Sequence, residues 1–171
     1  GGQGLMIGYV CKYTPVEVFE AMGVEIRRIQ PEVTNFNQAD TLMHPNICSF
    51  TKSVLEDVLA GDYEGVVLTT CCDSIRRLYD VLKQQCPDKF LYLLDVPRKV
   101  NDFSTEMYRK NILDMVHAYE AFSGKTFDET VLKQLLERRE AGQNLRTAPK
   151  NKASVHIGLM GARCSKGIID L

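Results

Sequence analysis

The sequence lacks an excess of charge of either sign and lacks any long hydrophobic run. Its 171 residues carry 21 Lys plus Arg against 22 Asp plus Glu, a formal net charge of −1 at pH 7. This balance leaves no summed positive field to hold a polyanion, so we expect no nucleic-acid partner. No apolar stretch approaches the roughly 18 to 20 residues that a membrane-spanning helix requires, so we expect no membrane segment.

Two familiar active-site patterns are also absent. The three histidines, at 44, 117 and 156, have no spacing that would join them in a zinc site, a Ser-His-Asp triad or a Cys-His pair. The glycine-containing segment 161–167 lacks the residue order of a phosphate-binding loop. The sequence therefore offers no support for hydrolytic triads, zinc enzymes or P-loop proteins.

Six cysteines are present, and the start of the chain shows neither the basic nor the apolar region of a secretory signal peptide. Structural disulfides are rare in a reducing cytosol. We therefore expect a soluble, cytoplasmic protein whose cysteines are core residues, catalytic thiols or metal ligands.

Apolar runs typical of strands alternate with apolar residues at helical spacing. The predicted strands cover 5–10, 24–29, 64–70, 90–94 and 155–160, and the predicted helices cover 16–23, 49–60, 75–85, 104–122 and 127–139. Residues 32–46 are polar and rich in turn formers, so we expect an ordered loop or short excursion there. This alternation predicts an α/β fold with an open parallel sheet and helices on both faces, Rossmann-like or flavodoxin-like.

The helix after the first strand begins with a recognisable signal. Thr14 is expected to be its N-cap, Pro15 fits the first helical position, and Glu17 stands three residues after the cap as in a capping box. Glu17 therefore has two interpretations, a capping-box partner or a carboxylate at the mouth of a site.

Cysteines follow the predicted strands, at the edge of the sheet where parallel α/β proteins bind ligands. Cys71 and Cys72 stand between a buried strand and a helix, where unpaired N–H groups and the helix dipole favour a thiolate. The alternative makes Asp73 the N-cap and the two thiols structural. Cys11 and Cys164 also follow strands; Cys164 is interpreted as part of a turn, and Cys11 fits either interpretation.

Cys48 stands directly before the helix 49–60, at a second junction between loop and helix. Thiolates at the starts of two helices, Cys48 and Cys72, can converge above one sheet edge, which suits an iron–sulfur cluster. A purely structural role for Cys48 is the alternative, and Cys86, at the end of a helix, is expected to be structural.

Three segments in the same order and spacing carry a resemblance to a known family. Residues 13–23 resemble a Tyr-x-Pro-x-Glu…Ala-x-Gly motif, residues 48–53 a Cys-x-apolar-x-Lys/Arg-Ser motif, and residues 65–77 a strand leading to Thr-x-Cys-Asp-x-x-Arg/Lys. Together they resemble the D-component family of 2-hydroxyacyl-CoA dehydratases, which also includes benzoyl-CoA reductase subunits and double-cubane-cluster proteins.

The resemblance implies a subunit that holds a 4Fe-4S cluster through cysteines from separate loops. Motif matching makes Cys48 and Cys72 the ligands and Cys71 an extra residue. Glu17 is expected to be a catalytic residue near the same strand edge. The resemblance also implies three partners: a sister dehydratase subunit, an ATP-dependent activator and an acyl-CoA substrate. One electron from the activator would convert the thioester into a ketyl radical, which then loses water.

Family subunits are longer than this chain, and a second α/β domain supplies their third cluster cysteine. Residues 156–163 resemble the strand that opens that domain. We therefore expect a cluster-binding α/β domain over 1–152 and, over 153–171, the start of a second domain or a C-terminal strand and turn. The third ligand is expected outside this chain, and the chain by itself is expected to be inactive.

Three alternatives remain beside a dehydratase component. One is an ATP-dependent reductase of the double-cubane type, which would hold more iron per subunit. Another is a metal-free subunit that serves assembly or regulation. The last is a flavodoxin-like domain that binds a small molecule without iron.

Overall fold

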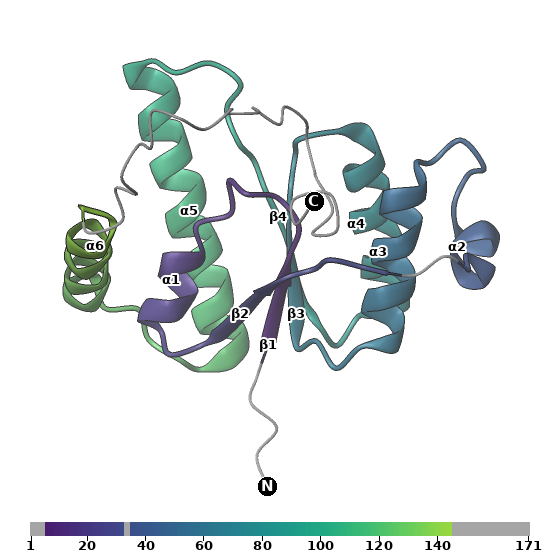
Figure 1. Cartoon of the computed structure of the whole chain (residues 1–171), viewed down its shortest axis with the longest axis horizontal. Helices are drawn as coiled ribbons and strands as arrows, with labels where there is room; N and C mark the ends of the chain where they lie inside the picture. The colour runs from purple at the N-terminus through teal and green to yellow at the C-terminus, as the bar shows by residue number, and fades with distance from the viewer. Residues whose placement is uncertain (1–5, 33–34, 145–171) are drawn as a thin grey trace, which may run out of the picture. The chain divides into compact units, whose positions relative to one another are not determined.

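A computed structural model describes residues 6–32 and 35–144 of the chain. Strands and helices alternate along most of its length (Figure 1), which confirms the predicted α/β class. The elements are β1 (Met6–Tyr9), α1 (Val16–Ala21), β2 (Glu25–Arg28), α2 (Asn37–Leu42), α3 (Ser49–Ala60), β3 (Gly65–Thr69), α4 (Asp73–Gln85), β4 (Phe90–Leu94), α5 (Asp102–Ser123) and α6 (Glu129–Asn144).

The four described strands form one parallel sheet in the order β2-β1-β3-β4. Strand β1 pairs with β2 on one side and with β3 on the other, so Ile7 lies between Ile26 and Gly65. The chain therefore changes direction across the sheet between β1 and β3. In open parallel sheets such a switch point leaves a crevice at the carboxyl ends of the two strands.

Helices cover both faces of this sheet, as predicted (Figure 1): α3 and α4 lie on one face, and α1 and α5 on the other. Strand β3 is buried along its whole length, and its side chains alternate between the two cores. Val66 and Leu68 pack with residues of α3 and α4, whereas Val67 packs with Phe19 and Tyr119. The strand that leads to Cys71 and Cys72 is thus held rigidly from both sides.

Helix α2 differs from the sequence prediction, which gave no helix within 32–46. Its first N–H groups, from Gln38 and Ala39, donate to a Glu56 carboxylate oxygen at 2.7 and 2.8 Å. Glu56 belongs to α3, so the acceptor that satisfies the start of α2 comes from a distant part of the sequence. Turn-forming composition therefore concealed a short helix that depends on a tertiary contact.

The predicted capping box at the start of α1 is wrong. The N-cap is Pro15, no side chain caps the helix, and α1 begins at Val16. A turn in which the Thr14 N–H donates to the Cys11 carbonyl at 3.0 Å places Thr14 inward. Its hydroxyl is buried and has no hydrogen-bond partner in the described part of the chain.

The predicted strand over 155–160, the boundary between residues 152 and 153, and Cys164 lie outside the described residues. The division into two domains therefore stays a prediction. Among the helices that the structure describes, none combines the length and the hydropathy needed to cross a bilayer.

Candidate functional site

Cys48 and Cys72 occupy the same kind of position on two helices that pack together. Cys48 is the N-cap of α3 and Cys72 is the N-cap of α4; both are extended and exposed. N-cap positions favour Ser, Thr, Asp or Asn, whose side-chain oxygen accepts from the first turn; here both positions hold a cysteine instead. Both thiols therefore stand at the positive end of a helix. Asp73 is the first residue of α4, so its interpretation as the N-cap is wrong.

The Cys48 thiol lies among hydrogen-bond donors. Its Sγ is 3.1 Å from the Thr51 Oγ1. Partial burial raises the pKa of this thiol, but hydrogen bonds from the hydroxyl and N–H of Thr51, the Ser74 hydroxyl and the Phe50 N–H together bring the pKa below its ordinary value of 9.0. Ser74 belongs to the first turn of α4, so the starts of both helices meet at Cys48.

Cys71 has the opposite character. Partial burial is the main cause that raises the pKa of its thiol; the Thr69 hydroxyl lowers this pKa by less, and the neighbouring Cys72 and Cys11 add smaller increases. The expectation that a helix start lowers thiol pKa values is therefore wrong for Cys71. Cys11, Cys71 and Cys72 gather at the carboxyl ends of β1 and β3, where the sheet topology places the crevice.

A pocket of about 500 Å³ opens at this edge. Its walls come from the loops after β1, β3 and β4 and from the first turns of α5, and they include the thiols of Cys11 and Cys71. The Tyr108 hydroxyl donates to the Tyr13 carbonyl at 2.7 Å. The full lining is Cys11, Tyr13, Thr69, Thr70, Cys71, Val96, Pro97, Arg98, Lys99, Val100, Ser104, Thr105 and Tyr108.

Two basic residues of the β4–α5 loop, Arg98 and Lys99, stand in the wall of this pocket. Sequence reasoning singled out neither of them, nor Tyr108. These residues lie far from Cys11 in the sequence and meet it only through the order of the strands. The pocket therefore combines apolar surface, thiols and positive charge, a combination suited to an apolar ligand that carries an anionic group.

Glu17 lies in the first turn of α1, half-buried. Burial raises the pKa of Tyr108, and the charges of Cys11 and Glu17 raise it further. Glu17 therefore lies close enough to act electrostatically on a residue of the pocket wall, although it is not part of that wall. Because α1 has no capping box, the interpretation of Glu17 as the partner of a Thr14 cap is wrong.

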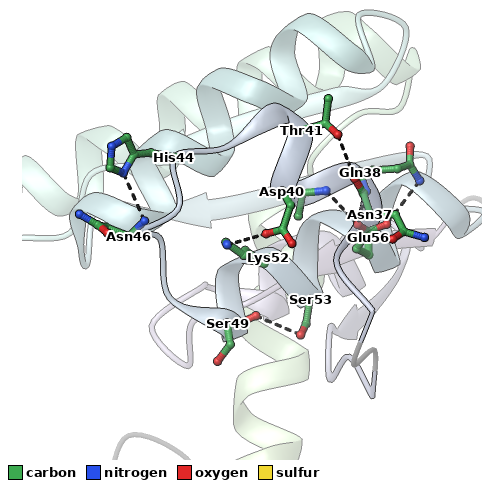
Figure 2. A network of polar contacts seen from close by, with 11 residues as sticks. Asn37, Gln38, Asp40, Thr41, His44, Asn46, Ser49, Lys52, Ser53 and Glu56 are labelled. Atoms are coloured by element: carbon green, nitrogen blue, oxygen red, sulfur yellow. Dashed lines mark hydrogen bonds and ion pairs between the residues drawn. The ribbon is translucent and has the colours of Figure 1, made fainter.

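The remaining sequence candidates do not join this cluster. Cys86 is buried in the core, as predicted, and His44 and His117 are exposed. The His44 ring accepts from the Asn46 N–H at 3.2 Å (Figure 2). Over residues 6–32 and 35–144, no three Cys, His, Asp or Glu side chains are grouped so that they would hold a metal ion.

A family model for the 2-hydroxyglutaryl-CoA dehydratase D-component matches residues 11–153. The chain belongs to this family. The match confirms the resemblance carried by the three motifs, and it covers both N-cap cysteines and the whole pocket.

One curated relative of this D-component chain is the (R)-phenyllactyl-CoA dehydratase beta subunit of Clostridium sporogenes. The two are 27% identical over 139 residues, which cover 77% of this chain and 36% of that subunit. The chain thus spans about a third of the length of the relative it matches. The ligand roles of Cys48 and Cys72, and the role of Glu17, stay predictions.

Proposed function

We propose that this chain is the part of a 2-hydroxyacyl-CoA dehydratase component that supplies Cys48 and Cys72 as ligands of a 4Fe-4S cluster. The observation that carries the proposal is that the two cysteines occupy equivalent positions. Each is the exposed N-cap of its helix, and the Ser74 hydroxyl of one helix contacts Cys48 of the other. The donors fit in kind, because thiolates are the usual ligands of such clusters. A third cysteine would come from outside this chain.

The surroundings of the thiols support a division of roles. Hydrogen bonds to Cys48 favour its thiolate, the form that binds iron, whereas the raised pKa of Cys71 favours a protonated thiol. When bound, a cluster of this kind supplies the single electron that the dehydration of an acyl thioester requires. Helix N-termini and hydroxyl donors around its sulfur ligands would stabilise the added charge.

The pocket beside Cys71 is the proposed place for the acyl-CoA substrate. Its apolar wall suits an acyl chain, and Arg98 and Lys99 suit the anionic groups of the coenzyme. Glu17 is proposed as a catalytic carboxylate at the same edge, where its charge raises the pKa of Tyr108. Since the relative is named as a beta subunit, a sister subunit is a proposed partner, together with an ATP-dependent activator.

The test is anaerobic iron and sulfide analysis of the protein, purified with the chains that accompany it. We expect Cys48→Ser and Cys72→Ser to lose most of the iron and the visible absorbance of the cluster, while the matched variant Cys71→Ser retains both. Unchanged absorbance in Cys48→Ser and Cys72→Ser would overturn the proposal. The iron count of the wild type separates a single 4Fe-4S cluster from a double-cubane reductase.

A further inference from the structure

Thr51 is a fully buried threonine whose hydroxyl faces the Cys48 sulfur. It is 0% exposed, and its Oγ1 lies 3.1 Å from the Cys48 Sγ. Cys48 is the N-cap of α3, so Thr51 is the third helical residue, and its side chain reaches back over the first turn. A β-branched side chain in a helix has few χ1 choices. The hydroxyl is therefore held at the sulfur by both packing and backbone.

The direction of this hydrogen bond depends on the state of the sulfur. In the free thiol, either atom can donate. A thiolate or an iron-bound sulfur carries no proton, so Thr51 must then be the donor. The Ser74 hydroxyl, from the first turn of α4, stabilises the same thiolate and lowers its pKa.

Hydrogen bonds to cluster sulfurs are one of the means by which proteins set a reduction potential. The added electron makes the cluster more negative, so a donor aimed at a ligating sulfur stabilises the reduced state more than the oxidised one. We propose that Thr51 is a positioning residue whose hydroxyl donates to the Cys48 sulfur and raises the reduction potential of the bound cluster. This inference rests on the proposed function.

The experiment is a redox titration of the purified, cluster-containing protein, followed by visible absorbance and electron paramagnetic resonance. Thr51→Val keeps the shape of the side chain but removes the donor, and we expect a threefold to tenfold lower ratio of reduced to oxidised cluster at fixed potential. Tenfold corresponds to a shift of about −59 mV for a one-electron couple. Thr51→Ser keeps a hydroxyl and should restore most of the wild-type potential.

Thr41→Val is the matched control, because the Thr41 hydroxyl donates to the Asn37 carbonyl at 3.0 Å on the surface of α2. Its potential should equal that of the wild type. If Thr51→Val does not fold, Thr51→Ala removes the same donor with different packing and is expected to show the same negative shift.

The outcomes separate the two proposals. A wild-type protein without iron, or a Cys48→Ser variant with an intact cluster, would overturn the proposed function. A cluster that depends on Cys48 but keeps its potential in Thr51→Val or Thr51→Ala would leave that function standing and overturn the role of Thr51.

Discussion

At the scale of single residues, the starts of α3 and α4 show that a helix terminus does not by itself decide the character of a thiol. Cys48 and Cys71 both lie at such a start, yet their pKa values are shifted in opposite directions. Hydroxyl and N–H donors surround Cys48, while partial burial and two neighbouring thiols raise the pKa of Cys71. The immediate donors therefore outweigh the dipole that both sites share.

This contrast predicts an order of reactivity in the iron-free protein. Alkylation follows the thiolate fraction, which at neutral pH is larger for a thiol with a lowered pKa. We expect iodoacetamide to label Cys48 several-fold faster than Cys71 at pH 7, with the difference shrinking as the pH rises above 9. Peptide-resolved mass spectrometry after short pulses measures both rates in one sample.

Thr51→Val provides the internal control for that experiment. Loss of the hydroxyl donor should raise the pKa of Cys48 and slow its labelling, while the rate at Cys71 stays unchanged. Faster labelling of Cys71 than of Cys48 in the wild type would contradict the prediction, since both thiols are exposed.

At the scale of elements, the position of α2 depends on its contacts with α3 (Figure 2). The Glu56 carboxylate accepts from the N–H groups of Gln38 and Ala39. One turn earlier, the Lys52 ammonium reaches Asp40 at 2.6 Å, with 11% of the lysine side chain and 61% of the aspartate side chain exposed. The loop between α2 and α3 ends at Cys48. The two charged contacts therefore anchor the segment that leads to a proposed cluster ligand.

Removing the Glu56 carboxylate should release α2 and leave the sheet intact. Hydrogen bonds to a charged acceptor contribute about 1.5–3 kcal/mol, so Glu56→Ala is expected to lower the free energy of unfolding by about that amount. Hydrogen exchange should become faster in residues 37–47 and stay slow in β3. Both effects are measurable by urea unfolding and by exchange mass spectrometry.

Glu106→Ala is the control, because Glu106 forms an exposed ion pair with Arg109 at 3.5 Å on α5. Such surface pairs contribute at most about 1 kcal/mol. Protection of residues 37–47 that is equal in Glu56→Ala and Glu106→Ala would show that α2 does not depend on the Glu56 contact.

At the scale of the whole molecule, local patterns in the sequence were sufficient to predict the parallel sheet and the helices on both of its faces. Apolar runs such as Val66–Leu68 and turn residues such as Gly23 are local signals, and the strands they predict within the described residues are present. The N-cap cysteines were found for the same reason, since each stands between a loop and a periodic apolar pattern. Their roles as cluster ligands stay predictions.

What the sequence could not predict depends on contacts between distant residues. Helix α2 needs the Glu56 carboxylate, and the turn at Cys11–Thr14 buries the Thr14 hydroxyl, which the sequence pattern predicted to cap α1. The pocket joins Cys11 to Arg98 and Tyr108 across the switch point of the sheet. None of these contacts is signalled by a local pattern in the sequence.

The sheet that holds the site depends on a close approach at Gly65, the first residue of β3. Gly65 pairs with Phe90 of β4, and a Cβ added at Gly65 would lie 2.6 Å from the Phe90 Cβ and closer still to its carbonyl oxygen. A backbone atom cannot move aside as a flexible side chain does, so Gly65→Ala must push β3 and β4 apart. Overpacking of this kind costs about 1–3 kcal/mol.

Because β3 ends next to Cys71 and Cys72, Gly65→Ala should weaken iron binding as well as stability. Gly142→Ala is the matched control: nothing lies within 4 Å of its added Cβ, and alanine in α6 should stabilise the helix by up to about 1 kcal/mol. Urea midpoints and iron content, measured on both variants, test the link between sheet and site. A Gly65→Ala protein with the wild-type urea midpoint would show that β3 and β4 can separate without strain. A lowered midpoint with full iron content would show that the β3–β4 pair does not position Cys72.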